Sequence, residues 1–79
     1  MALFTFSQLN PFIIDNDSNI TLIIQNALAI HLRTFLNDLN IHNIKTTKGD
    51  NAYAGLTAFT IYDPKELDII KLYSRLYEN

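Results

Sequence analysis

The chain of 79 residues has no cysteine and no tryptophan, and only two glycines and two prolines. Without cysteine, neither a disulfide framework nor a zinc or iron–sulfur site with cysteine ligands can form. An uninterrupted apolar stretch of membrane-spanning length is also missing, because polar side chains break the run from Ile20 to Leu39. A hydrophobic content of 48% with 18% charged residues excludes a disordered chain. These features predict a single small domain over residues 1–79.

Charge is sparse as well. Six Lys and Arg stand against eight Asp and Glu, for a net charge of −2. This balance offers no basic footprint for a phosphate backbone and is too weakly acidic for DNA mimicry. The start of the chain has no basic region and no long apolar segment, so we expect no signal peptide and a cytoplasmic protein. Eleven Ile, nine Asn and no Val indicate an AT-rich genome.

The first residues favour a strand. Phe and Thr alternate in Leu3–Leu9, which predicts a strand that ends at Asn10 and Pro11. The short apolar run Phe12–Ile14 follows. It either extends the sheet or closes one end of the core.

A long helix is expected next, over Asn19–Leu39. Asp15–Ser18 consists of residues that cap helix N-termini, and Asn40 is suited to end the helix. Apolar residues recur at steps of three and four: Ile20, Ile24, Leu28, Leu32, Phe35 and Leu39. Leu22 and Ile30 lie outside this stripe, which indicates a second contact surface on the helix.

The remaining residues predict a hairpin and a final helix. Ile41–Thr47 forms a strand, Lys48–Asn51 a turn, and Ala52–Tyr62 a returning strand. One side of the returning strand carries Tyr53, Thr57, Phe59 and Ile61. Asp63–Glu66 then supplies an N-cap Asp, a Pro at the first helical position and a Glu at the capping-box position. The inward residues of the last helix are expected to be Ile69, Ile70, Tyr73, Leu76 and Tyr77.

This order, β-α-β-β-α, predicts an α+β fold: a two-layer sandwich of about three strands with two helices on one face. The other sheet face is then left open. If Phe59 and Ile61 point to the helices, strand alternation directs their neighbours to the open face. We expect partner-binding residues there: Asn43, Lys45, Thr47, Ala54, Leu56, Ala58 and Thr60.

Residues with catalytic or metal-binding chemistry form no complete motif. Asp15, Asp17 and Asn19 match the first ligands of an EF-hand loop, but Ile20 replaces its glycine and Asn26 its bidentate glutamate. The two histidines have no ligand spacing, and the serines have no nucleophile-elbow pattern. We therefore expect no catalytic residue, no metal, no cofactor and no enzymatic activity.

By elimination, the sequence indicates a small protein-binding regulator or inhibitor that forms a homodimer or binds another protein. The size and the AT-rich bias also suit a phage or mobile-element protein, such as an anti-CRISPR inhibitor of host defence. The alternative is a nucleic-acid-binding or transcription-regulating module, for which Lys45, Lys48, Tyr53 and Phe59 are the candidate surface. A structural subunit of a larger assembly is the third hypothesis. No membrane contact is expected.

Overall fold

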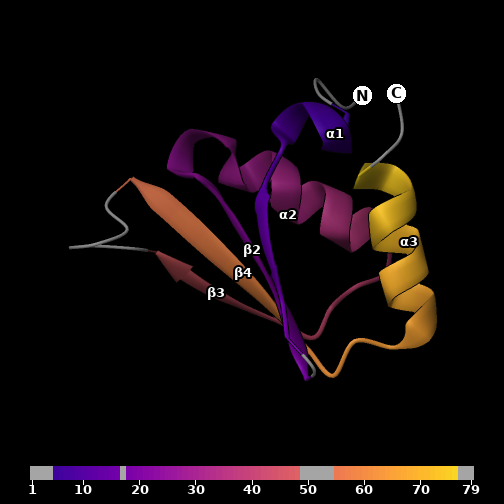
Figure 1. Ribbon diagram of the computed structural model, residues 1–79. Helices are drawn as coiled ribbons and strands as arrows, with labels where there is room; N and C mark the ends of the chain where they lie inside the picture. The colour runs from indigo at the N-terminus through magenta and orange to yellow at the C-terminus, as the bar shows by residue number, and fades with distance from the viewer. Residues whose placement is uncertain (1–4, 17, 49–54, 77–79) are drawn as a thin grey trace.

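One antiparallel sheet and the helices packed on it account for the residues that the computed structural model describes, which are 5–16, 18–48 and 55–76. Figure 1 shows all the labelled helices on the same side of the sheet. The sheet has four strands in the order β1-β2-β4-β3. In chain order the elements are α1 (Phe6–Leu9), β1 (Phe12–Asp15), β2 (Asn19–Gln25), the short 3-10 helix η1 (Asn26–Leu28), α2 (Ala29–Asp38), β3 (Ile44–Lys48), β4 (Leu56–Tyr62) and α3 (Glu66–Leu76).

The predicted α+β class is confirmed, but the number and order of strands differ from the prediction. The sheet contains four strands instead of three, and three α-helices cover it instead of two in the described part of the chain. β2 and β3 each pair antiparallel with β4, so they run parallel to each other with β4 between them. The connection from β2 to β3 is therefore a crossover, and α2 lies within it.

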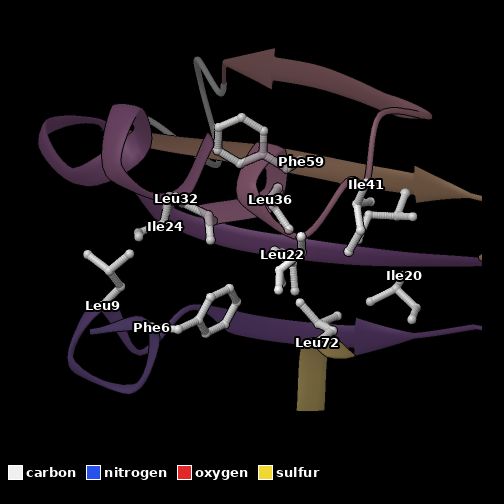
Figure 2. Packing of buried hydrophobic residues seen from close by; sticks show 12 residues of the cluster. Phe6, Leu9, Ile20, Leu22, Ile24, Leu32, Leu36, Ile41, Phe59 and Leu72 are labelled. Atoms are coloured by element: carbon white, nitrogen blue, oxygen red, sulfur yellow. The ribbon is translucent and has the colours of Figure 1, made fainter. Parts of the chain in front are cut away.

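The two central strands supply the floor of the core. Ile20, Leu22 and Ile24 of β2 are buried, and so are Thr57, Phe59 and Ile61 of β4. From the helices come Phe6, Leu9, Leu32, Leu36 and Leu72, and Figure 2 shows these side chains gathered over β2. The rings of Phe6 and Phe35 meet edge to face, with centroids 5.8 Å apart, which joins α1 to α2.

The helix predicted for Asn19–Leu39 is wrong in its first part, where the chain forms β2. Ile20 and Ile24 are four residues apart, and this spacing puts them on one side of a strand as well as on one side of a helix. Leu22 was placed outside the helical stripe, yet it is fully buried. The β-branched residues between Ile20 and Ile24 were the signal for a strand.

Asp15, Asn16 and Ser18 do not cap a helix, because β2 follows them, and Asp17 lies outside the described residues. The backbone N–H of Asn16 donates to the backbone carbonyl of Asn19 over 2.9 Å. The side-chain Nδ2 of Asn16 donates to Oδ1 of Asn19 over 3.2 Å. These bonds close the β1–β2 hairpin. Asp, Asn and Ser serve turns and N-caps by the same local hydrogen bonds, which is why the composition misled.

The strand predicted for Leu3–Leu9 is also wrong. Phe6–Leu9 is α1, and Thr5 and Gln8 form a complete capping box at its start. Leu3 and Phe4 lie outside the described residues. Of the two alternatives for Phe12–Ile14, the first holds: this run extends the sheet as the edge strand β1.

The C-terminal half agrees more closely with the prediction. Both expected strands exist as β3 and β4, while Gly49–Ala54 lies outside the described residues. α3 begins at Glu66, whereas the prediction places its first residue at Pro64. The predicted N-cap at Asp63 is wrong, because its φ of 47° is left-handed and an N-cap residue is extended. The backbone N–H of Lys65 donates to the side chain of Asp68. Ile70, predicted to face inward, is exposed, whereas Leu72 is fully buried. The side chain of Leu76 and the whole of Tyr77 lie outside the described part of the chain.

The predicted end of the first long helix at Asn40 is confirmed for α2. Asn40 adopts the left-handed conformation with a φ of 60°, and its N–H donates to the carbonyl of Asn37. The next N–H, of Ile41, donates to the carbonyl of Leu36 over 3.0 Å. Together these bonds form a Schellman motif, and the burial of Ile41 and Leu36 completes its apolar contact.

Substitution of Asn40 tests this helix end. We expect Asn40→Ala to lower the free energy of unfolding by about 1 kcal/mol, because a Cβ without a polar side chain is strained at positive φ. Asn40→Gly should keep or raise the stability, since glycine adopts this conformation freely. Urea denaturation measures both variants, with Asn37→Ala in the helical, exposed part of α2 as the control. Equal stability of the Ala and Gly variants would contradict the motif.

A second prediction compares two phenylalanines on either side of the α1–β1 junction. Phe6 is 2% exposed and Phe12 is 65% exposed. Phe6→Ala should cost about 3–5 kcal/mol of unfolding free energy, whereas Phe12→Ala should change it by less than about 0.5 kcal/mol. Denaturation at submicromolar concentration is the measurement. A similar cost for both would mean that α1 does not contribute to the core.

Candidate functional site

The sheet face away from the helices, here called the open face, is composed of alternate residues from all four strands. The register aligns Phe12, Ile23, Ala58 and Thr47 in one row across the sheet, and Ile14, Thr21, Thr60 and Lys45 in the next. The outer positions belong to Asn19 and Tyr62 at one end and to Gln25 and Leu56 at the other. The Thr21 and Thr60 hydroxyls are 3.2 Å apart and share a hydrogen bond.

Several apolar side chains on the open face are exposed, because the described helices lie on the other side of the sheet. Phe12 is 65% exposed, Tyr62 43% and Ile14 40%. Ile23 and Leu56 are half-buried. Contiguous apolar exposure on a sheet is a feature of docking surfaces in soluble domains.

Most of the residues predicted for partner binding lie together on this face: Lys45, Thr47, Leu56, Ala58 and Thr60. Asn43 precedes β3, where its carbonyl accepts a hydrogen bond from the Tyr62 N–H over 3.0 Å. Ala54 lies outside the described residues.

The sequence-based prediction missed the other half of the open face, which comes from β1 and β2. Its residues include Phe12, Ile14, Thr21 and Ile23. Thr21 and Ile23 were missed because Asn19–Gln25 is predicted as helix, and Phe12 and Ile14 because the sequence leaves the role of Phe12–Ile14 open. The signal that could have found them is the β-branched composition of β2.

The open face carries little charge. Its only ionisable group besides the Tyr62 phenol is Lys45, at the β3 edge, and no carboxylate is present among its described residues. A face of this composition favours contact with neutral or apolar surfaces. It offers no oxygen ligand set for a hard cation.

A different environment lies on the helix side, between α2 and β3. Two adjoining hollows of about 380 and 330 Å³ share Arg33, Thr46 and Phe59 in their linings. We call this pair of hollows the α2–β3 groove. Figure 2 shows the Phe59 ring in the space between these two elements. The other residues that line it are Asn26, Ala29, Ile30, Thr34, Asn37, Ile41, His42, Ile44, Lys48 and Thr57.

Arg33 reaches across this groove from α2 to β3. Its guanidinium donates to the Thr46 hydroxyl over 2.9 Å and lies 5.8 Å from the centroid of the Phe59 ring. Lys48 lines the same groove, and none of the lining residues is a carboxylate. Ile30, placed outside the helical stripe by its sequence position, lines the groove as well and is 68% exposed.

The other residues considered for catalysis or metal binding do not lie together in one site. Asp15 accepts a hydrogen bond from the Tyr73 hydroxyl over 3.0 Å, which ties β1 to α3. His31 is half-buried on α2, and His42 is exposed before β3. Within residues 5–16, 18–48 and 55–76, no group of three His, Asp or Glu is placed to hold a metal ion. The same residues contain no helix with the length and apolarity to cross a membrane.

Comparison of the chain with protein-family models, with curated proteins and with solved structures finds no match in any of the three.

Proposed function

We propose that the protein is a non-enzymatic, protein-binding regulator or inhibitor that pairs as a homodimer through its open face. The observation that carries this proposal is the one-sided cover of the sheet, which leaves Phe12, Ile14 and Tyr62 exposed. Burial of apolar side chains is the main favourable term in protein association. An exposed cluster on a chain of this size is therefore best explained by a protein that covers it.

The groove does not favour catalysis over binding. Its ionisable groups are Arg33, His42 and Lys48, and no carboxylate in the lining orients the histidine or activates a hydroxyl. Amide, hydroxyl and cationic groups of this kind bind ligands without reacting with them. This composition supports the non-enzymatic part of the proposal.

The occupant that we propose for the open face is a second copy of the chain. A twofold pair brings identical patches together, and the centre of this patch is uncharged, with the Ile23–Ala58 pair beside the Thr21–Thr60 pair. Lys45 lies on the edge strand, so it can remain at the solvated rim of the interface. No carboxylate of the face has to lose its hydration in the process.

The dimensions of the sheet set the strength of such a pair. With strands of four, seven, seven and five residues about 4.8 Å apart and a rise of about 3.4 Å per residue, the open face covers about 375 Å². Two copies would bury about 750 Å² in total, less than the roughly 1,200 Å² at which stable interfaces begin. We therefore expect association in the micromolar range. In this dimer the helices and the β3 edges stay available to a further partner.

Sedimentation equilibrium from submicromolar to hundreds of micromolar concentration tests the pairing. The mean mass of the wild-type chain should rise from that of one chain towards that of two. Phe12→Lys and Leu56→Lys should remain monomeric over the same range: the first removes the most exposed large apolar side chain of the face, and the second would bury an unpaired ammonium group on a central strand.

The matched control is Leu67→Lys, which makes the same kind of change at a residue of α3 that is 59% exposed. It should dimerise like the wild type. A wild-type chain that stays monomeric, or a control that is disrupted as strongly as Phe12→Lys, would show the proposed pairing to be wrong.

A further inference from the structure

β3 is an edge strand with one side available for pairing. It bonds to β4 on one side, and no described strand lies on its other side. Four of its five residues are exposed, and it contains neither proline nor glycine. An edge of this kind is a template for one more strand.

The backbone groups that point away from β4 can be assigned from the register. The Tyr62 N–H donates to the Asn43 carbonyl, which makes Asn43 and Tyr62 a hydrogen-bonded pair. Antiparallel strands alternate such pairs with pairs that are not bonded to each other. The backbone groups of Ile44, Thr46 and Lys48 therefore point outward, although the Ile44 N–H is taken by the His42 carbonyl.

The side chains of these same three residues lie on the helix side of the sheet. Thr46 is opposite Phe59 and Lys48 is opposite Thr57, and both of these partners are buried under the helices. A strand added along this edge would thus place every second side chain over the α2–β3 groove. The intervening side chains would lie on the open face beside Lys45.

Positive charge is concentrated at this edge. Three of the six cations in the chain are Arg33, Lys45 and Lys48, and all three lie on α2 or β3. Two of them, Arg33 and Lys48, line the groove without a carboxylate in the lining. The opposite edge of the sheet, β1, carries Asp15 and no cation.

Lysines on an edge strand also discourage pairing between copies, since like charges would meet. This role explains Lys45 and Lys48 but not Arg33, which belongs to α2 and is held over β3 by its bond to Thr46. An arginine in this position favours an anionic strand, because its guanidinium forms charge-assisted hydrogen bonds with carboxylates.

We propose that the β3 edge binds an acidic, extended peptide segment of a partner protein as an added strand, with its carboxylates on alternate residues over Arg33 and Lys48. The proposal deepens the protein-binding function above by naming the chemistry of the partner. It uses a different surface from the proposed dimer. Antiparallel addition is expected, because antiparallel pairs are the more stable and the more common.

A nucleic acid is the other polyanion that could reach these cations, and the structure favours it less. Of the two aromatic residues on the candidate nucleic-acid surface, Phe59 is 2% exposed and Tyr53 lies outside the described residues. Lys45 and Lys48 point to opposite sides of the sheet, so they do not form one phosphate track. The outward backbone groups of β3, in contrast, match a peptide and not a phosphate backbone.

Fluorescence anisotropy with a labelled peptide of alternating glutamate and valine tests the proposal. Arg33→Met and Lys48→Gln should each weaken binding about five- to tenfold, as loss of one charge-assisted contact does. Lys45→Gln should have a smaller effect, because the glutamates face the groove. The control is Lys65→Gln, which removes the same charge from an exposed residue outside β3 and should leave binding unchanged.

Backbone pairing is tested by two N-methylated forms of the same peptide. In an antiparallel addition, the residues facing the groove donate their N–H groups to β3. Methylation of the glutamate nitrogens should therefore abolish binding, and methylation of the valine nitrogens should not. The reverse result would indicate a parallel added strand, which supports the proposal equally.

Three results would overturn the proposal: unchanged binding of both methylated peptides, equal losses for Lys65→Gln and Arg33→Met, or tighter binding of a single-stranded oligonucleotide than of the peptide. Phe12→Lys should bind the peptide like the wild type, since it alters only the open face. Failure of the dimer and failure of peptide binding can thus be told apart. All the substituted cations are exposed, and thermal unfolding of each variant verifies its fold.

Discussion

The pairing of β2 with β4 sets both the core and the open face of the protein. Seven aligned residue pairs, from Asn19 with Tyr62 to Gln25 with Leu56, hold the central strands in register. Three pairs face the helices and the pairs between them face away; the three are Ile20 with Ile61, Leu22 with Phe59 and Ile24 with Thr57. A slip of one residue would exchange the two faces and expose the core, so the core and the open face are specified together.

The same pairing explains why the groove exists. β4 lies between the two parallel strands β2 and β3, so the crossover through α2 has to pass over β4. Leu32 and Leu36 of α2 pack in the core with Leu22 of β2, while β3 stays at the outer edge with most of its side chains exposed. The helix side of β3 therefore remains open, and Arg33 spans the distance to Thr46.

The two candidate surfaces differ in the physical basis of recognition. The open face offers apolar area with almost no charge, which favours a non-directional contact of modest strength. The β3 edge offers directional backbone groups and three nearby cations, which favour an extended anionic segment. Because the surfaces lie on different parts of the sheet, a dimer formed by one leaves the other accessible.

β4 and the end of α2 are predictable from local sequence patterns alone. Thr57, Phe59 and Ile61 are spaced by two residues, a period that no helix satisfies, so the orientation of Leu56, Ala58 and Thr60 followed from local alternation. Asn40 was predictable because few side chains tolerate a left-handed backbone. The β-branched residues of β2 favour a strand, but its assignment, and with it the part of the open face that β2 carries, depends on tertiary pairing. Ile20 and Ile24 fit both a helix and a strand, and alignment with β4 selects the strand because it buries Leu22 as well.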